Sequence, residues 1–140
     1  MKCPRIRKRG RHILTSVVGA LLVSLVGYGH AHAEGDAGNG DARRGADVFA
    51  QACAGCHSVK ENKHKMGPSL FAVVGRPRGS IPDFPYSDAL KRAGLTWTAS
   101  QLDTYIADPQ KAVPGVRMYT GLNDAKARAD LLEYLKSLHS

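Results

Sequence analysis

The stretch Cys53-Ala54-Gly55-Cys56-His57 decides the fold. Its pattern, C-x-x-C-H, is the covalent attachment signature of a c-type haem. The spacing suits this chemistry because two thiols must reach two vinyl groups of one ring, and the following imidazole is then placed beneath the iron. We therefore predict one haem c, attached covalently through Cys53 and Cys56, with His57 as an axial ligand.

Two other interpretations of this pattern are weaker. A thioredoxin-like redox pair needs a strand–helix–strand context, and no segment of useful length alternates apolar and polar residues. A zinc site needs further Cys or His residues at ligand spacing, and only the isolated His64 and His139 follow the motif. His64 is expected to lie at the surface or to hydrogen-bond a loop.

The second axial ligand is predicted to be Met118. Of the three methionines, Met1 belongs to the N-terminal segment, and Met66 follows His57 too closely to reach the opposite face of the ring. Met118 lies 61 residues beyond His57 in a Pro- and Gly-containing loop, which can close over the iron. A core role for Met118, with an open sixth site, is the alternative.

The N-terminal segment has the features of a targeting sequence and not those of a folded domain. A basic stretch is followed by an apolar run, residues 13–27, and by Ala31-His32-Ala33. These features predict a secretory signal peptide over residues 1–33, cleaved after Ala33, or else an uncleaved membrane anchor. In both cases the folded part lies across the membrane, which predicts a periplasmic location. Residues 34–40 are expected to be a flexible leader and residues 41–140 one domain.

The basic character of the whole chain is misleading. The sequence of 140 residues has a net charge of +8, but six of its 20 basic residues and none of its 12 acidic residues lie in residues 1–33. The remainder carries only +2, so the electrostatic footprint of a nucleic-acid-binding protein is missing. We predict no nucleic-acid partner.

The pattern of helix-capping residues predicts an all-α fold with four to five short helices and long ordered loops. The first helix should bury Gly45, Val48, Phe49 and Ala52. Loops of this length in a small domain indicate that something other than protein fills the centre. The expected helices run from Asp41 to about Ala54, from Ser87 to Gly94, and from the Thr98–Gln101 capping box to a point before Pro109. A last helix is expected to begin near Asp124, with an apolar stripe that ends at Leu138.

With these motifs, residues 40–138 resemble the class I cytochromes c of the mitochondrial-like and bacterial soluble branch. The resemblance implies the small all-α cytochrome c fold, in which the first and last helices cross. Gly45 and Phe49 match the contact on the first helix, and Leu131 and Tyr134 match it on the last.

The resemblance also implies further haem-binding residues. Pro68 matches the proline whose carbonyl accepts a hydrogen bond from the proximal imidazole, and Tyr105 matches the tyrosine that bonds the methionine sulfur. Three side chains match those that bind the haem propionates: Arg76, Tyr86 and Trp97.

Three departures from the family pattern affect the pocket. Val116 stands where the family often has Thr, and Leu90 stands where Asn is common. The segment after Met118 is one residue shorter, which leaves open whether Tyr119 or Thr120 lines the haem edge.

The resemblance implies a one-electron carrier, not an enzyme. The alternatives are a haem enzyme or gas-binding protein with an open sixth site, and a dedicated cytochrome subunit of a periplasmic dehydrogenase. The expected partners are membrane redox complexes, reductases or photosynthetic centres, and the encounters with them are transient. The protein itself is expected to be a monomer. A rim of basic residues around the haem edge would steer acidic partners. Its candidates are Lys60, Lys63, Lys65, Arg76, Arg78, Lys91, Arg92, Lys111 and Arg117.

Overall fold

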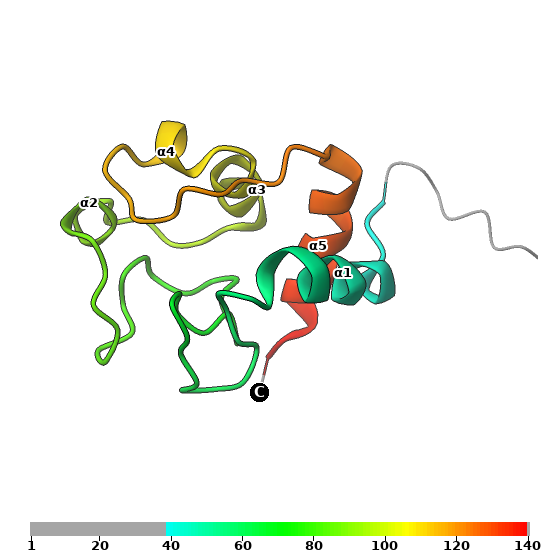
Figure 1. Cartoon of the computed structure of the whole chain (residues 1–140), viewed down its shortest axis with the longest axis horizontal. Coiled ribbons are helices and arrows are strands. Elements are labelled where there is room, and N and C mark those ends of the chain that lie inside the picture. Colours follow the sequence, from blue (N-terminus) through cyan, green and yellow to red (C-terminus); the bar gives the residue numbers. More distant parts are fainter. Residues whose placement is uncertain (1–38, 140) are drawn as a thin grey trace, which may run out of the picture. The chain divides into compact units, whose positions relative to one another are not determined.

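The computed structural model describes residues 39–139, and the predicted signal peptide lies outside this range. The described part is helical and has no strand (Figure 1). It contains one isolated bridge, between Pro77 and Thr96. Within it, no helix has the length and apolar character needed to cross a membrane. The elements are α1 (Ala42–Val48), the π-helical turn η1 (Phe49–Cys53), α2 (Asp88–Arg92), α3 (Ala99–Ala107), α4 (Pro109–Ala112) and α5 (Ala125–Ser137).

The helices begin where the sequence predicts. The side chain of Asp41 accepts a hydrogen bond from the Arg44 amide at 2.9 Å, which satisfies one free donor of the first turn. Thr98 and Gln101 form the reciprocal capping box at the start of α3. Ser87 and Asp124 cap α2 and α5, since the side chain of each accepts a hydrogen bond from the backbone amide three residues later.

Two details differ from the prediction. The first helix widens into η1, where the Ala54 amide donates to the carbonyl of Phe49 at 2.8 Å, a five-residue step. The wider turn changes the helical register, so Ala52 is exposed and not on the buried face. The sequence pattern does not predict the short helix α4, because a proline at position 109 indicates the end of the preceding helix. Proline is tolerated at the first helical position, and Asp108 caps the new helix.

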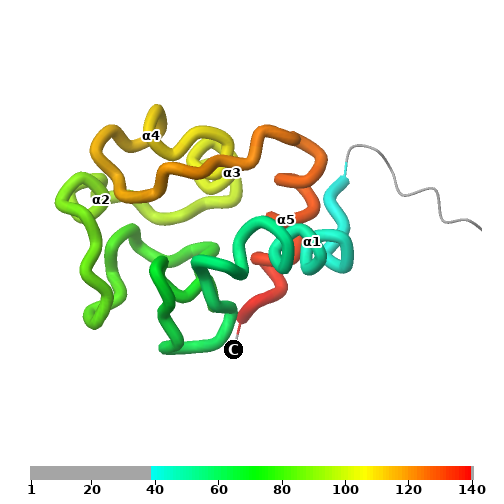
Figure 2. Tube along the Cα trace, viewed as in Figure 1, coloured from blue at the N-terminus to red at the C-terminus, as the bar shows by residue number. Residues whose placement is uncertain are grey.

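The first and last helices cross at Gly45. A side-chain carbon on Gly45 would lie within 2.7 Å of the backbone carbon of Asp130 and would overlap its oxygen, so only glycine allows this approach. Beside the crossing, the rings of Phe49 and Tyr134 pack with centroids 5.8 Å apart, and Leu131 is 1% exposed. Figure 2 shows α1 lying across α5. The contact predicted between the terminal helices is therefore present.

Asp130 joins the two helices by charge as well. Its carboxylate accepts from the Asp41 amide at 2.7 Å, from Arg44 Nε at 2.9 Å and from Lys126 Nζ at 2.6 Å. The hydrogen bonds from Arg44, followed by those from Lys126 and the Asp41 amide, hold the pKa of Asp130 well below its usual range, against the opposing effect of desolvation. The ionised carboxylate thus ties the start of α1 to the middle of α5.

Replacing Gly45 tests the crossing. Helix propensity alone predicts that Gly45→Ala raises the free energy of unfolding. The overlap with the Asp130 backbone predicts the opposite, a loss of about 1–3 kcal/mol or more, measured by denaturant unfolding of the haem-loaded protein. Asp47→Ala is the control, because Asp47 is an exposed position of the same helix where alanine adds no overlap. A Gly45 variant as stable as this control would contradict the argument.

Asp130→Asn tests the ionic contact through pH. In the folded protein the pKa of Asp130 lies below the unfolded value of about 3.9. The ionised carboxylate therefore contributes to the free energy of unfolding above that pH, and its contribution is lost as the pH falls. We expect the variant to be less stable than the wild type at neutral pH and the two unfolding curves to converge in acid. Asp47→Asn, at an exposed position of α1, is the control. A stability difference independent of pH would show that shape, not charge, matters.

Candidate haem site

The attachment segment begins where η1 ends. Cys53 is the last residue of η1, and the amides of Cys56 and His57 both donate to its carbonyl, at 3.0 and 2.9 Å. Cys53 is half-buried, Cys56 is exposed, and neither is in a disulfide. Before the haem is attached, burial, and to a smaller extent the neighbouring Cys56, raises the pKa of Cys53 to about 11, so this thiol is neutral at physiological pH.

His57 is held with one ring nitrogen free for a metal. Its Nδ1 lies 2.8 Å from the carbonyl oxygen of Pro68 and donates to it, since that oxygen can only accept. Burial lowers the pKa of His57, which favours the neutral imidazole, and the Pro68 bond partly offsets this effect. A side-chain carbon at Gly67 would lie within 2.6 Å of Nδ1 and overlap the ring. The loop thus fixes the imidazole and leaves Nε2 with a lone pair, as a ligand of iron requires.

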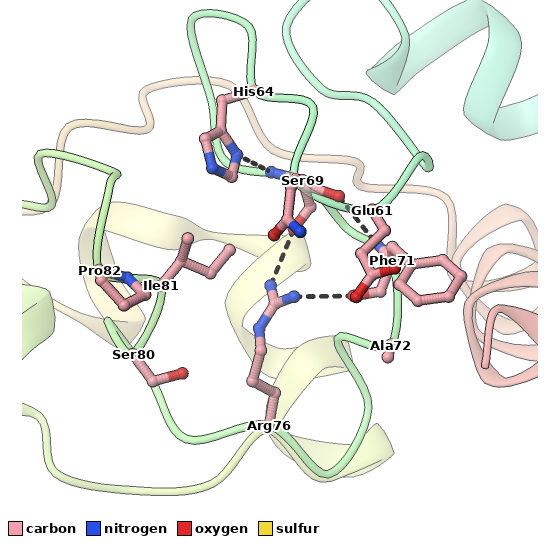
Figure 3. A pocket seen from close by; sticks show the side chains of 10 residues that line it. Glu61, His64, Ser69, Phe71, Ala72, Arg76, Ser80, Ile81 and Pro82 are labelled. Carbon is pink, nitrogen blue, oxygen red and sulfur yellow. Dashed lines mark hydrogen bonds between the residues drawn. The ribbon is translucent and has the colours of Figure 1, made fainter. Parts of the chain in front are cut away.

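Arg76 is fixed by backbone carbonyls at the wall of a cavity of about 300 Å³. Figure 3 shows its guanidinium donating to the carbonyls of Phe71 and Ser69, both at 2.8 Å. In the same view His64 accepts from the Ser69 amide at 3.1 Å, the loop-bonding role expected for it. Burial lowers the pKa of Arg76, and the nearby Tyr86 partly offsets this. Neither cysteine of the motif lines this cavity.

The three predicted aromatic residues of the pocket are all buried. Trp97 packs on Tyr105 with ring centroids 4.8 Å apart, and Tyr86 packs on Phe84 at the same separation. Burial raises the pKa of Tyr105 to about 12, with the positive charge of Arg78 opposing the shift, and burial also raises the pKa of Tyr86. Both phenols therefore keep their protons and can donate hydrogen bonds.

The loop that carries Met118 is braced from two directions. The side-chain amide of Gln110, on α4, donates to the carbonyl of Val116 at 2.7 Å and to that of Met118 at 2.8 Å. Arg117 donates to the carbonyl of Pro85. The Met118 side chain is partly buried and packs against the hydrophobic core. Sequence reasoning missed Gln110, because no local pattern distinguishes it from other glutamines.

The predicted basic rim needs a correction. Arg76 and Arg78 are half-buried, and the guanidinium carbon of Arg78 lies 4.2 Å from the centre of the Trp97 ring. These two arginines point inward and do not belong to the rim. The other seven candidates are exposed. After Met118, Tyr119 is 79% exposed and Thr120 is exposed as well.

These residues suit a haem bound through two thioethers. Two cysteines lie at the two ends of one turn, an oriented imidazole follows, and buried aromatic side chains have polar ends able to donate hydrogen bonds. The family model described as cytochrome c matches residues 42–139. The chain belongs to the cytochrome c family. With this membership, the predicted all-α cytochrome c fold and the single covalently attached haem c are confirmed.

Several relatives of this cytochrome c are similar over nearly their whole length. A cytochrome c2 from Rhodopila globiformis is 43% identical over 105 residues, which cover 74% of this chain and 99% of that protein. A cytochrome c from Gibberella zeae is 42% identical over 69% of this chain and 93% of its own length. The solved structure of cytochrome cH from Methylobacterium extorquens is 42% identical, with a TM-score of 0.65, covering 70% of this chain and 99% of that one. The protein is an electron carrier that works with redox partner proteins, and it is not an enzyme.

Proposed function

We propose that this cytochrome c carries single electrons through a haem whose iron is ligated by His57 and Met118. The observation that carries the proposal is the fixed imidazole, with Nδ1 bonded to Pro68 and Nε2 free. When bound, the haem supplies one-electron exchange between its ferric and ferrous states. The chain must then hold the ligands in place, exclude water and tune the balance between the two states.

Met118 is proposed to close the second face. A thioether is a neutral, polarisable donor that favours the reduced iron and raises the potential. The Tyr105 phenol, buried and protonated, is proposed to bond its sulfur. Because Gln110 holds the carbonyls of Val116 and Met118, the loop resists opening. This brace favours the closed carrier over the alternative with an open sixth site.

The remaining pocket residues are proposed to bind the propionates. Tyr86 and Trp97 are buried and offer an O–H and an N–H donor. Arg76 supplies a cation whose terminal nitrogens are already oriented by two carbonyls. Buried carboxylates need such donors, because an unpaired charge in an apolar pocket is strongly unfavourable.

The ligation is tested by spectroscopy of the haem-loaded protein. Wild type should show the weak sulfur-to-iron band in the ferric form and no binding of carbon monoxide in the ferrous form. Met118→Ala should lose the band and bind carbon monoxide. Gln110→Ala should keep the band at low temperature and lose it on warming before the wild type does, because the loop is less constrained.

Met66→Ala is the matched control, since Met66 is 79% exposed and removing it should change neither readout. A Met118 variant with the wild-type band, or a wild type that binds carbon monoxide readily, would contradict the proposed ligation.

Partner docking is proposed to be electrostatic and transient. The exposed rim candidates are Lys60, Lys63, Lys65, Lys91, Arg92, Lys111 and Arg117. A basic surface of this kind accelerates encounters with acidic redox partners. We expect the bimolecular rate of electron transfer to an acidic partner to fall by about tenfold between low and physiological salt. A rate that does not change with salt would contradict electrostatic docking.

Residues 1–33 are proposed to direct export, so that the cytochrome works in the periplasm, free or tethered to the membrane. The intact mass of the protein recovered from the periplasm tests this, because cleavage after Ala33 removes a defined segment. A role as the dedicated subunit of one periplasmic dehydrogenase is the alternative. It predicts that the cytochrome copurifies with that enzyme at a fixed ratio, whereas a shuttling carrier does not.

A further inference from the structure

A short antiparallel pairing sets the direction of two arginines. Pro77 lies opposite Thr96 in the isolated bridge, and the Trp97 amide donates to the carbonyl of Arg76 at 2.9 Å. In extended chains, side chains alternate between the two faces. Pro77 and Thr96 face outward and are exposed, so Arg76, Arg78 and Trp97 share the inward face.

Arg78 lies on this inward face without an acceptor for its Nε–H group. Its guanidinium carbon is 4.2 Å from the centre of the Trp97 ring. Trp97 also packs on Tyr105, and the positive charge of Arg78 acts on the Tyr105 phenol. The Nε atom is buried with no hydrogen-bond partner. None of the ion pairs among residues 39–139 involves Arg78. A half-buried cation with an unpaired donor is costly, which indicates that a further acceptor belongs beside it.

Arg76 leaves room for a second cation in the pocket. Each of its terminal nitrogens gives one N–H to a carbonyl, of Phe71 or of Ser69, so only its remaining N–H groups are free for a propionate. Leu90 and Val116 are buried and apolar, and they offer no donor to an anion in the pocket. A haem brings two carboxylates, and the strongest partner for a carboxylate is a guanidinium.

We propose that Arg78 is a second arginine of the haem pocket, stacked on Trp97 and paired with a haem propionate. Its charge would compensate the propionate and disfavour the additional positive charge of ferric iron. Arg78 therefore stabilises the reduced state and is a residue that sets the potential. This assignment requires the haem and does not depend on which residue is the second axial ligand.

The test compares three variants of the haem-loaded protein by spectroelectrochemistry. At a fixed solution potential, Arg78→Gln should raise the ferric-to-ferrous ratio by about threefold or more, because a nearby cation is removed. Arg78→Lys keeps the charge and should lie between this variant and the wild type. Arg43→Gln removes an equal charge from an exposed position on α1, outside the rim, and should change the ratio less than about twofold.

Resonance Raman spectra distinguish pairing from a distant charge effect. The propionate bending band should shift in Arg78→Gln, and it should not shift in Arg43→Gln. An Arg78→Gln variant with the control's potential, or one whose potential changes while the band stays fixed, would overturn the proposal. The sulfur-to-iron band of each variant separates this result from the Met118 proposal, because it reports the axial ligand alone.

Discussion

The close crossing of α1 and α5 is the contact on which the rest of the structure depends. Because Gly45 has no side chain, the backbones approach closely enough for Asp130 to reach the start of α1. α1 continues into η1, so the crossing sets the position of Cys53. At the other end of α5, the carbonyl of Leu138 accepts from the Ala72 amide at 2.7 Å, which anchors the loop on the far side of the motif. One helix pair therefore positions Cys53, where the attachment motif begins, and Ala72, in the loop that follows the motif.

Long loops connect these helices, and they hold a fixed conformation because they pack around the group that they enclose. Of the five α-helices between residues 39 and 139, all but α5 have nine residues or fewer, so packing between helices alone gives a small core. The largest buried side chains of the middle region are aromatic and carry polar ends: Tyr86, Trp97 and Tyr105. Such residues pack well around a flat cofactor and lose hydrogen bonds around an empty centre. The haem that the family carries is thus part of the core as well as the redox group.

Sequence reasoning succeeded where a local pattern fixes the outcome and failed where distant contacts do. Caps were predictable because a side-chain oxygen and its backbone partner lie three residues apart. Ala52 was placed on the wrong face because a five-residue turn leaves no signature in composition. Arg78 was assigned to the rim because charge alone does not reveal that an antiparallel pairing turns it inward. Gln110 gave no signal, since its acceptors are two carbonyls of a loop whose path depends on the whole fold.

The two braces on the loop around Met118 bear on the choice between carrier and enzyme. An enzyme that binds substrate at iron needs a sixth site that opens, and its distal loop must move. Here Gln110 fixes the loop from α4, while Arg117 fixes it to Pro85, on a segment distant in sequence. Opening would break both sets of hydrogen bonds and leave backbone carbonyls unpaired, which is costly. Electron exchange has the opposite need, because a rigid site changes little between oxidation states. The bracing therefore suits a carrier that only exchanges electrons.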